Sequence, residues 1–241
     1  MIELRGLEKS FGEVHAVRGV SLIAADGLIT GLLGANGAGK TTTMRMLYTL
    51  MRPDAGQVLV DGIDAAVDPC AARRRMGVLP DARGIYKRLT TRENIDYFGR
   101  LQGLDEDTLR TRREALVDAL DMHDIADRRA EGFSQGQRLK TALARALVHD
   151  PRNVVLDEPT NGLDVMATRN LRTFLRGLKA EGRCVLFSSH IMQEVAALCD
   201  RVVIISDGRV LAAGTLDELR ELTGEHDLEE AFLHVVQKGV S

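Results

Sequence analysis

The stretch GANGAGKTTT, from Gly34 to Thr43, places three glycines before a lysine and three threonines. Its first eight residues match the pattern G-x-x-x-x-G-K-[ST], in which a glycine-rich loop folds around phosphate groups. The preceding LITGLL reads as a short apolar strand, and the following TTTMRMLYTLM predicts a helix that ends before Pro53. A glycine-rich turn without a ligand is the plainer alternative, and the complete pattern in this context disfavours it. The sequence therefore predicts a phosphate-binding loop.

Each part of this loop has an expected role. Glycines let backbone N–H groups approach phosphate oxygens, and the helix that begins near Lys40 adds the positive end of its dipole. Lys40 is expected to reach the β- and γ-phosphates, and the Thr41 hydroxyl to bind Mg²⁺. The expected nucleotide contacts are Gly34, Ala35, Asn36, Gly37, Ala38, Gly39, Lys40, Thr41 and Thr42.

A pair of carboxylates ends another predicted strand, NVVLDE, from Asn153 to Glu158. Acidic pairs in this position often only face solvent at a turn. With a phosphate-binding loop upstream, the catalytic interpretation is favoured, and the two motifs support each other. Asp157 is then expected to contact Mg²⁺, directly or through water, and Glu158 to face the attacking water.

Composition limits the classes of protein to consider. The chain has 241 residues, of which 44% are hydrophobic and 28% charged, as expected for a globular domain. Its apolar runs fall far short of the roughly 20 residues that cross a bilayer, and its first residues do not form a secretory signal, so we expect a cytosolic protein. A net charge of −3 argues against nucleic-acid binding. Three widely spaced cysteines, Cys70, Cys184 and Cys199, predict buried thiols rather than disulfides or a zinc site.

The pattern along the chain predicts an α/β fold. Residues 1–25 read as an antiparallel hairpin lobe, and about 84–150 as a helical sublobe. Strands and helices then alternate, which is typical of a parallel sheet with crossover helices. The tail, about 215–241, predicts two short amphipathic helices. No linker or repeat divides the chain, so 1–241 is expected to be a single domain.

The segment Phe133-Ser134-Gln135-Gly136-Gln137 resembles the signature of ATP-binding cassette (ABC) ATPases. The resemblance continues without a break through QRLKTALARALVHDPRNVVLDEPTNGLD, and it covers residues 1 to about 215. The usual signature is Leu-Ser-Gly-Gly-Gln, so Phe133 and Gln135 depart from it. The resemblance implies a P-loop NTPase fold of the ABC ATPase type: a RecA-like parallel sheet, an N-terminal antiparallel β lobe and a helical sublobe.

The resemblance also implies roles in ATP recognition. Ser134, Gly136 and Gln137 would contact the γ-phosphate, and a helix cap by Ser134 is compatible with that role. Phe11 would stack on adenine with Val17 nearby, although an aromatic residue in a β segment is more often part of the core.

The catalytic residues implied by the resemblance are Glu158, His190 and Lys40. His190 follows the apolar strand LFSS, as the family's switch histidine does, and would orient Glu158 and the attacking water. The family's glutamine after the strand MGVLP is replaced by Asp81, which retains the ability to approach Mg²⁺ but lacks the amide donor. Asp81 is therefore a conditional ligand of Mg²⁺ or water, with a loop cap as its alternative role.

The stretches DARGIY, FSQGQ and EPTNGLDVMATR are similar to the ATPase subunits of sodium-efflux ABC transporters, the NatA type. This similarity implies an ATP-hydrolysing, membrane-peripheral subunit that docks from the cytoplasm onto separate permease subunits, with Na⁺ as a candidate export substrate. A second ATPase subunit, identical or different, would complete the ATP sites. A soluble assembly-factor ATPase and a binding module that hardly hydrolyses ATP are the alternatives, and intact Glu158 and His190 argue against the second.

Overall fold

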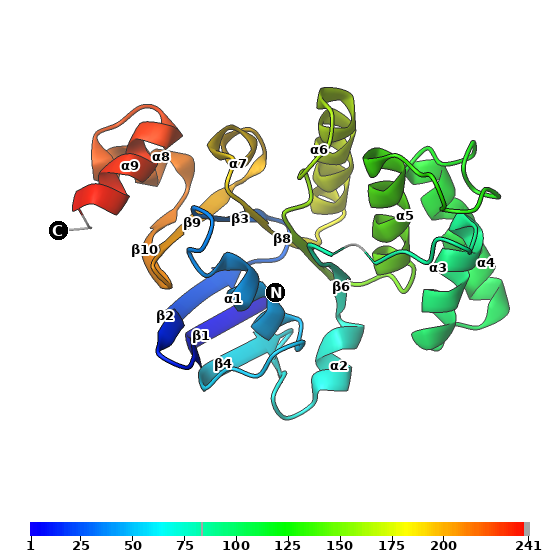
Figure 1. The fold of residues 1–241 in the computed structure, drawn as a ribbon, viewed down its shortest axis with the longest axis horizontal. Coiled ribbons are helices and arrows are strands. Elements are labelled where there is room, and N and C mark those ends of the chain that lie inside the picture. Colours follow the sequence, from blue (N-terminus) through cyan, green and yellow to red (C-terminus); the bar gives the residue numbers. More distant parts are fainter. Residues whose placement is uncertain (83, 239–241) are drawn as a thin grey trace.

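The computed structural model describes residues 1–82 and 84–238. The strands are β1 (Ile2–Phe11), β2 (Val14–Ala24), β3 (Ile29–Leu33), β4 (Ala55–Val60), β5 (Ile63–Asp64), β6 (Met76–Leu79), β7 (Asn153–Asp157), β8 (Cys184–Ser189), β9 (Arg201–Ser206) and β10 (Arg209–Gly214). The helices are α1 (Lys40–Leu47), α2 (Pro69–Arg74), α3 (Thr91–Leu101), α4 (Glu106–Ala119), α5 (Gln135–Leu147), α6 (Val165–Ala180), α7 (Met192–Leu198), α8 (Leu216–Thr223) and α9 (Leu228–Lys238). Figure 1 shows their arrangement.

Four strands form an antiparallel sheet in the order β2-β1-β4-β5. β1 pairs with β2 from Ile2–Ala24 at one end to Phe11–Val14 at the hairpin, and with β4 on its other side. The hairpin predicted for residues 1–25 is therefore confirmed. Figure 1 shows this sheet, in blue and cyan, as a lobe beside the central sheet.

Six strands form the central sheet in the order β10-β9-β3-β8-β7-β6. All neighbours are parallel except β10, which returns antiparallel to β9. β3 leads into the glycine loop and lies against β8, whose other neighbour is β7. Carboxyl ends of parallel strands meet at one edge of a sheet, so the residues that follow β3, β7 and β8 are brought together there.

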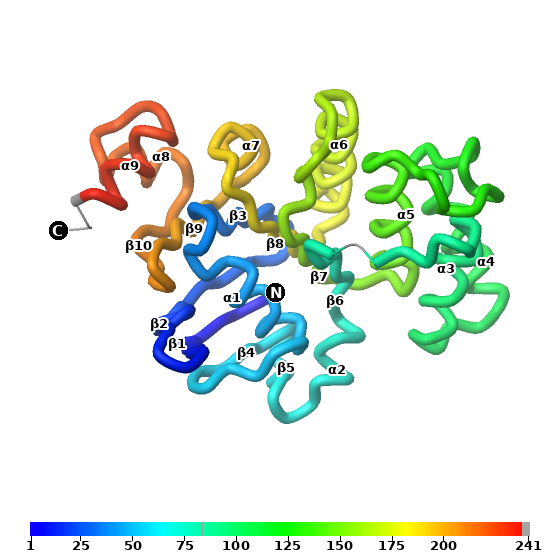
Figure 2. The backbone as a smooth tube through the Cα atoms, in the orientation of Figure 1, coloured from blue at the N-terminus to red at the C-terminus, as the bar shows by residue number. Residues whose placement is uncertain are grey.

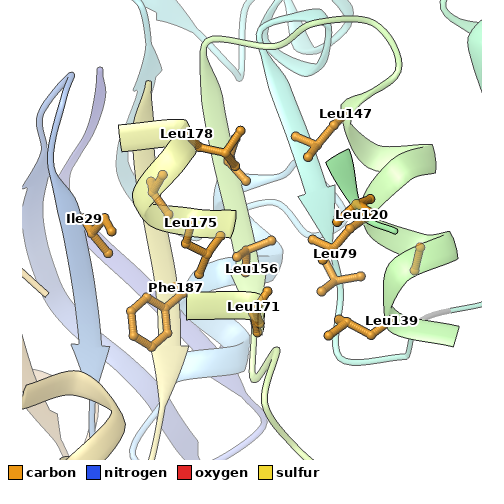
Figure 3. Close-up of a cluster of buried hydrophobic side chains, with 14 of the residues drawn as sticks. Ile29, Leu79, Leu120, Leu139, Leu147, Leu156, Leu171, Leu175, Leu178 and Phe187 are labelled. Carbon is orange, nitrogen blue, oxygen red and sulfur yellow. The ribbon is translucent and has the colours of Figure 1, made fainter. Parts of the chain in front are cut away.

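Side chains of the central strands alternate between two buried faces. Leu156 and Phe187 belong to a cluster with leucines of α6, which Figure 3 shows, and Val155 and Leu186 belong to a second cluster with α1 and the antiparallel sheet. Burial on both faces explains why these strands read as continuous apolar runs. The arrangement confirms the predicted α/β class with a parallel core and an antiparallel lobe.

Three helices, α3, α4 and α5, pack together at one end of the molecule, away from the antiparallel sheet in the backbone view of Figure 2. α3 begins at Thr91, because Thr90 and Glu93 form a reciprocal capping box with the backbone at that point. Asp105 caps α4 through its bond to the Thr108 N–H. The tail forms α8 and α9, the two short helices that the sequence predicts.

The helix after the glycine loop ends before Pro53, as predicted, but it is shorter than the predicted segment TTTMRMLYTLM. It ends at Leu47, because Thr49 adopts a left-handed conformation with φ 61°. The N–H groups of Leu50 and Met51 both turn back to the carbonyl oxygen of Arg45, which closes the helix end.

The cysteine prediction holds in part. Cys184 and Cys199 are buried free thiols, whereas Cys70 lies exposed on α2. Burial raises the pKa of the Cys184 thiol to about 12, so this thiol stays protonated at neutral pH. Within the described residues, no helix combines the length and apolar character needed to cross a membrane.

Candidate functional site

The glycine loop joins the buried strand β3 to α1, as the sequence predicts. A side chain at Gly34 would place its Cβ 2.4 Å from the carbonyl oxygen of Ile205 on β9, and one at Gly39 would place it 2.6 Å from that of Ala16 on β2. Gly39 also has φ 101°, a left-handed conformation that favours glycine. These two glycines are therefore required for packing the loop between β9 and β2.

Lys40 starts α1 with only 5% of its surface exposed. Its ammonium donates hydrogen bonds to the carbonyl oxygens of Gly34, at 2.7 Å, and Ala35, at 3.1 Å. It also lies 3.4 Å from Oε1 of Glu158. The Lys40 ammonium is thereby held among oxygen atoms at the mouth of the loop, where its positive charge would attract a phosphate group.

The carboxylates that follow β7 are fixed by a serine of β8. Ser188 pairs with Asp157 across the sheet, and its hydroxyl donates to Oδ1 of Asp157 at 2.6 Å. The same hydroxyl accepts the N–H of Glu158 at 3.0 Å. Glu158 has φ 48°, a left-handed conformation that is uncommon for residues other than glycine. The backbone at Glu158 is thus held in a strained turn that separates the two carboxylates, a pattern that favours a functional role.

His190 leaves β8 at the same edge of the sheet. Its Nδ1 lies 2.9 Å from Oε2 of Glu158, whose other oxygen faces Lys40. Glu158 is therefore bridged between a lysine and a histidine that are distant in sequence, and it is mostly buried, with 10% of its side chain exposed. A carboxylate held in this way has one defined orientation, which suits it to accept a proton from a water molecule.

A cavity of about 390 Å³ opens above the loop. Its lining residues are Ala16, Asn36, Gly37, Gly39, Lys40, Thr41, Thr42, Asp81, Glu158, Asn161 and His190. It therefore brings together the predicted catalytic residues, the glycine loop and Asp81. Asn161 and Ala16 line it without having been predicted.

A divalent cation fits beside Asp157. Oδ2 of Asp157 is buried and, in the part of the chain that the structure describes, lacks a hydrogen-bond partner. Burial raises the pKa of this carboxyl, and the negative charges of Asp81 and Glu158 contribute in the same direction. A cation would offset both effects, and the Thr41 hydroxyl and Asp81 carboxylate line the adjoining cavity. Oxygen donors of this kind are the ligands that Mg²⁺ prefers.

The segment from Ser134 to Gln137 begins α5 rather than lining this cavity. Ser134 accepts the N–H of Gln137, whose side chain returns a bond to the Ser134 N–H, so the two form a capping box. In the described residues, none of Ser134, Gly136 and Gln137 is among those lining the loop cavity. Gln135 lines a neighbouring cavity of about 500 Å³ that also reaches Asp81 and Glu158. Within one chain, the glycine loop and this segment are therefore separate surfaces.

Phe11 lies at the end of β1 with 47% of its surface exposed, so it does not belong to the core. The ammonium of Lys9 lies 5.9 Å from the centre of its ring. Val17 is buried and pairs with Lys9, whereas Phe11 pairs with Val14. An exposed aromatic face on this hairpin is compatible with stacking on a flat ring.

Sequence reasoning missed four polar residues at this edge of the sheet: Thr160, Ser188, Ser189 and Glu194. All four are buried. The sequence signal for these residues was the serine pair directly before His190. Consecutive polar residues at the end of a buried apolar strand need hydrogen-bond partners. Their partners follow from the strand order, which the sequence alone does not give.

Comparison with known proteins identifies relatives of the whole chain. The family model described as ABC transporter matches residues 17–161. The ABC transporter ATP-binding protein NatA of Bacillus subtilis (strain 168) is 44% identical over 246 residues, with all of both chains covered. The Nod factor export ATP-binding protein I of Burkholderia lata is 40% identical, with 91% of this chain and 72% of that protein covered. A solved structure, described as the ATP binding subunit of an ABC transporter, matches with a TM-score of 0.90 at 29% identity, covering 98% of this chain and 100% of that one.

Proposed function

Because the chain belongs to the ABC transporter family and is one of its ATPases, we propose that it uses Glu158, His190 and Lys40 to hydrolyse ATP and energise export through separate membrane-embedded subunits. The observation that carries this proposal is the Glu158 carboxylate, bridged by the Lys40 ammonium and the His190 imidazole at the mouth of the glycine loop.

The proposed chemistry is in-line attack of water on the γ-phosphate, which breaks its bond to the β-phosphate oxygen and releases ADP and inorganic phosphate. Glu158 orients the water and accepts its proton, while His190 keeps the Glu158 carboxylate in place and donates toward the γ-phosphate. Lys40 and the backbone N–H groups from Gly34 to Thr42 offset negative charge on the phosphates. Thr41, Asp157 and Asp81 would hold Mg²⁺, which supplies further positive charge when bound. Phe11 would stack on the adenine, with Val17 supporting the hairpin beside it.

We propose that two ATPase subunits form the complete site. The cavity at the glycine loop lacks Ser134, Gly136 and Gln137 among its described lining residues, which supports a site in which a second subunit presents them to the nucleotide. α5 begins at this segment, and the positive end of a helix suits a phosphate group. The partner subunit is either a second copy or a different ATPase, and the assembly lies on the inner face of the cell membrane.

Export, with Na⁺ as the first ion to test, is the proposed transport reaction. Two observations support it: the similarity to a protein named for Nod factor export, and the resemblance of this sequence to the ATPase subunits of sodium-efflux transporters. The stretches DARGIY, FSQGQ and EPTNGLDVMATR carry that resemblance.

Affinity purification tests this proposal. Tagged Glu158→Gln, which retains the shape of the side chain but not the base, is purified from native membranes with ATP and Mg²⁺, and proteins that accompany it are identified. Lys40→Ala, which removes the charge expected to hold the phosphates, is the matched control. A polytopic membrane protein recovered stoichiometrically with Glu158→Gln and less with Lys40→Ala is the expected result. A soluble partner, or none, contradicts the transporter role and favours an assembly-factor ATPase. Na⁺ flux is then measured in vesicles that contain the recovered complex.

A further inference from the structure

Glu194 is a buried carboxylate that the proposed chemistry does not use. It lies in the first turn of α7 with 8% of its surface exposed. Its Oε2 accepts a hydrogen bond from the Thr160 hydroxyl and lies 3.5 Å from the Ser189 hydroxyl, which donates to it. A buried carboxylate is costly unless it is hydrogen-bonded, so these two hydroxyl groups explain how Glu194 is tolerated at this position.

The two donors belong to the segments that carry the reacting groups. Thr160 follows Glu158 by two residues, and Ser189 immediately precedes His190. Both segments turn sharply: the Asn161 N–H bonds to the carbonyl oxygen of Glu158 at 3.2 Å, and the Ile191 N–H bonds to the Ser189 hydroxyl at 3.0 Å. A displacement at Thr160 or Ser189 is therefore passed directly to Glu158 or His190.

Ser188 forms an inner connection between the same two segments. It bonds to Asp157 and to the Glu158 N–H at the ends of the strands, before either segment leaves the sheet. The connection through Thr160, Glu194 and Ser189 lies one step further out. Ser189 is the last residue of β8 and still pairs with Leu33 of β3, whereas Thr160 and Glu194 lie beyond the paired residues of β7 and β8. Loss of Glu194 would thus leave the strands and the glycine loop intact and free the two turns to move apart.

We propose that Glu194 is a positioning residue for ATP hydrolysis, which through Thr160 and Ser189 holds Glu158 and His190 in register. The proposal rests on the proposed roles of Glu158 and His190. It also makes His190 sensitive to the segment Asn161–Asp164, because Thr160 immediately precedes that segment and the Leu163 N–H donates to the Thr160 carbonyl oxygen. Displacement of that segment would be transmitted to His190 through Glu194.

The test compares steady-state ATP hydrolysis by Glu194→Met, Glu194→Gln, Thr160→Val and the wild type. Glu194→Met keeps the length of the side chain and removes both acceptors, and Glu194→Gln retains one acceptor oxygen. We expect kcat to fall by about 10- to 100-fold in Glu194→Met and Thr160→Val, with KM for ATP within about twofold, as for other residues that orient a reacting group. Glu194→Gln should recover most of the activity. The double variant Thr160→Val/Glu194→Met should have the same kcat as Glu194→Met, because both changes break the same connection.

Two controls separate positioning from general destabilisation. Gln193→Met changes the exposed neighbour on the same helix, and Thr223→Val removes a buried hydroxyl of α8 that donates to the Leu219 carbonyl oxygen. Both should keep the wild-type kcat. If Glu194→Met does not fold, Thr160→Val against Thr223→Val decides the question. The proposal would be overturned if Thr160→Val and Glu194→Met had the same kcat as the controls. It would also be overturned if the double variant combined the full losses in kcat of the two single variants.

Hydrogen exchange provides a readout that does not depend on turnover. Backbone exchange in residues 158–164 and 189–195 should accelerate together in Thr160→Val, and again in Glu194→Met. Acceleration in only one of the two segments would show that Glu194 does not connect them. A wild-type protein that fails to hydrolyse ATP would contradict the proposed function, and exchange would still decide whether the connection exists.

Discussion

At the scale of single residues, the site depends on how a few charges are arranged in a small volume. Lys40 and His190 contact opposite oxygens of Glu158, while Asp157 keeps one oxygen bonded to Ser188. Its other oxygen is buried without a partner in the described chain. Glu158 thus has one defined orientation, as its proposed role toward water requires, and Asp157 has an oxygen that a cation could contact.

The raised pKa of Asp157 gives a prediction for stability against pH. Because burial raises this pKa, the ionised carboxylate destabilises the fold at pH 7, and protonation removes this effect as pH falls through the raised pKa. Asp157→Asn keeps an acceptor for Ser188 and carries no charge. Without Mg²⁺, its Tm at pH 7 should exceed that of the wild type by about 2–4 °C. The difference should shrink toward pH 4, as calorimetry can measure.

With ATP and Mg²⁺ present, the stability advantage of Asp157→Asn over the wild type should decrease or reverse. Addition of ATP and Mg²⁺ should raise the Tm of the wild type more than that of Asp157→Asn, since binding to the folded state stabilises it. A Tm difference that is independent of both pH and Mg²⁺ would contradict the assignment of Asp157 as a buried, cation-facing carboxylate.

At the scale of elements, the start of α5 combines a structural and a proposed functional role. Ser134 satisfies the Gln137 N–H, and Gln137 returns a bond to the Ser134 N–H, so the segment is an ordinary capping box. Thr215 and Glu218 form the same motif at the start of α8. The two helices therefore offer a matched pair, in which only one cap is proposed to contact nucleotide.

Replacing each cap by aspartate separates the two roles. Aspartate caps helices as well as serine does. The free energies of unfolding of Ser134→Asp and Thr215→Asp should therefore both lie within about 0.5 kcal/mol of the wild-type value. Ser134→Asp should lose ATP hydrolysis, because its carboxylate would face the partner's γ-phosphate, whereas Thr215→Asp should retain it. Equal activity of the two variants would place Ser134 away from the nucleotide.

Elements with a local signal could be predicted from the sequence. The glycine loop, the carboxylates after β7 and the helix begun by Ser134 each depend on residues close together in the chain. The end of α1 could not be predicted, since the left-handed turn at Thr49 has no glycine to announce it. The contact between Thr160 and Glu194 joins residues 34 positions apart and exists only because β7 and β8 are neighbours. The exposure of Phe11 likewise depends on tertiary packing.

At the scale of the whole molecule, the proposed ATP site is divided between two surfaces. The glycine loop, Glu158 and His190 converge at the carboxyl edge of the central sheet, whereas α5 belongs to the helical group on the far side of α6 in Figure 1. Both surfaces border cavities that share Asp81, Glu158 and Asn161. We propose that a second subunit covers both surfaces and that nucleotide binds between the two subunits.

The molar mass of Glu158→Gln in solution, measured by light scattering with and without ATP and Mg²⁺, tests whether ATP joins two subunits. Loss of the Glu158 charge removes repulsion toward the γ-phosphate and stops its hydrolysis, so ATP should remain between the subunits. We predict a monomer of 26.4 kDa without nucleotide and a doubling of that mass with ATP and Mg²⁺, which Lys40→Ala in the same chain should abolish. A mass that stays at the monomer value while ATP is bound would contradict the two-subunit site.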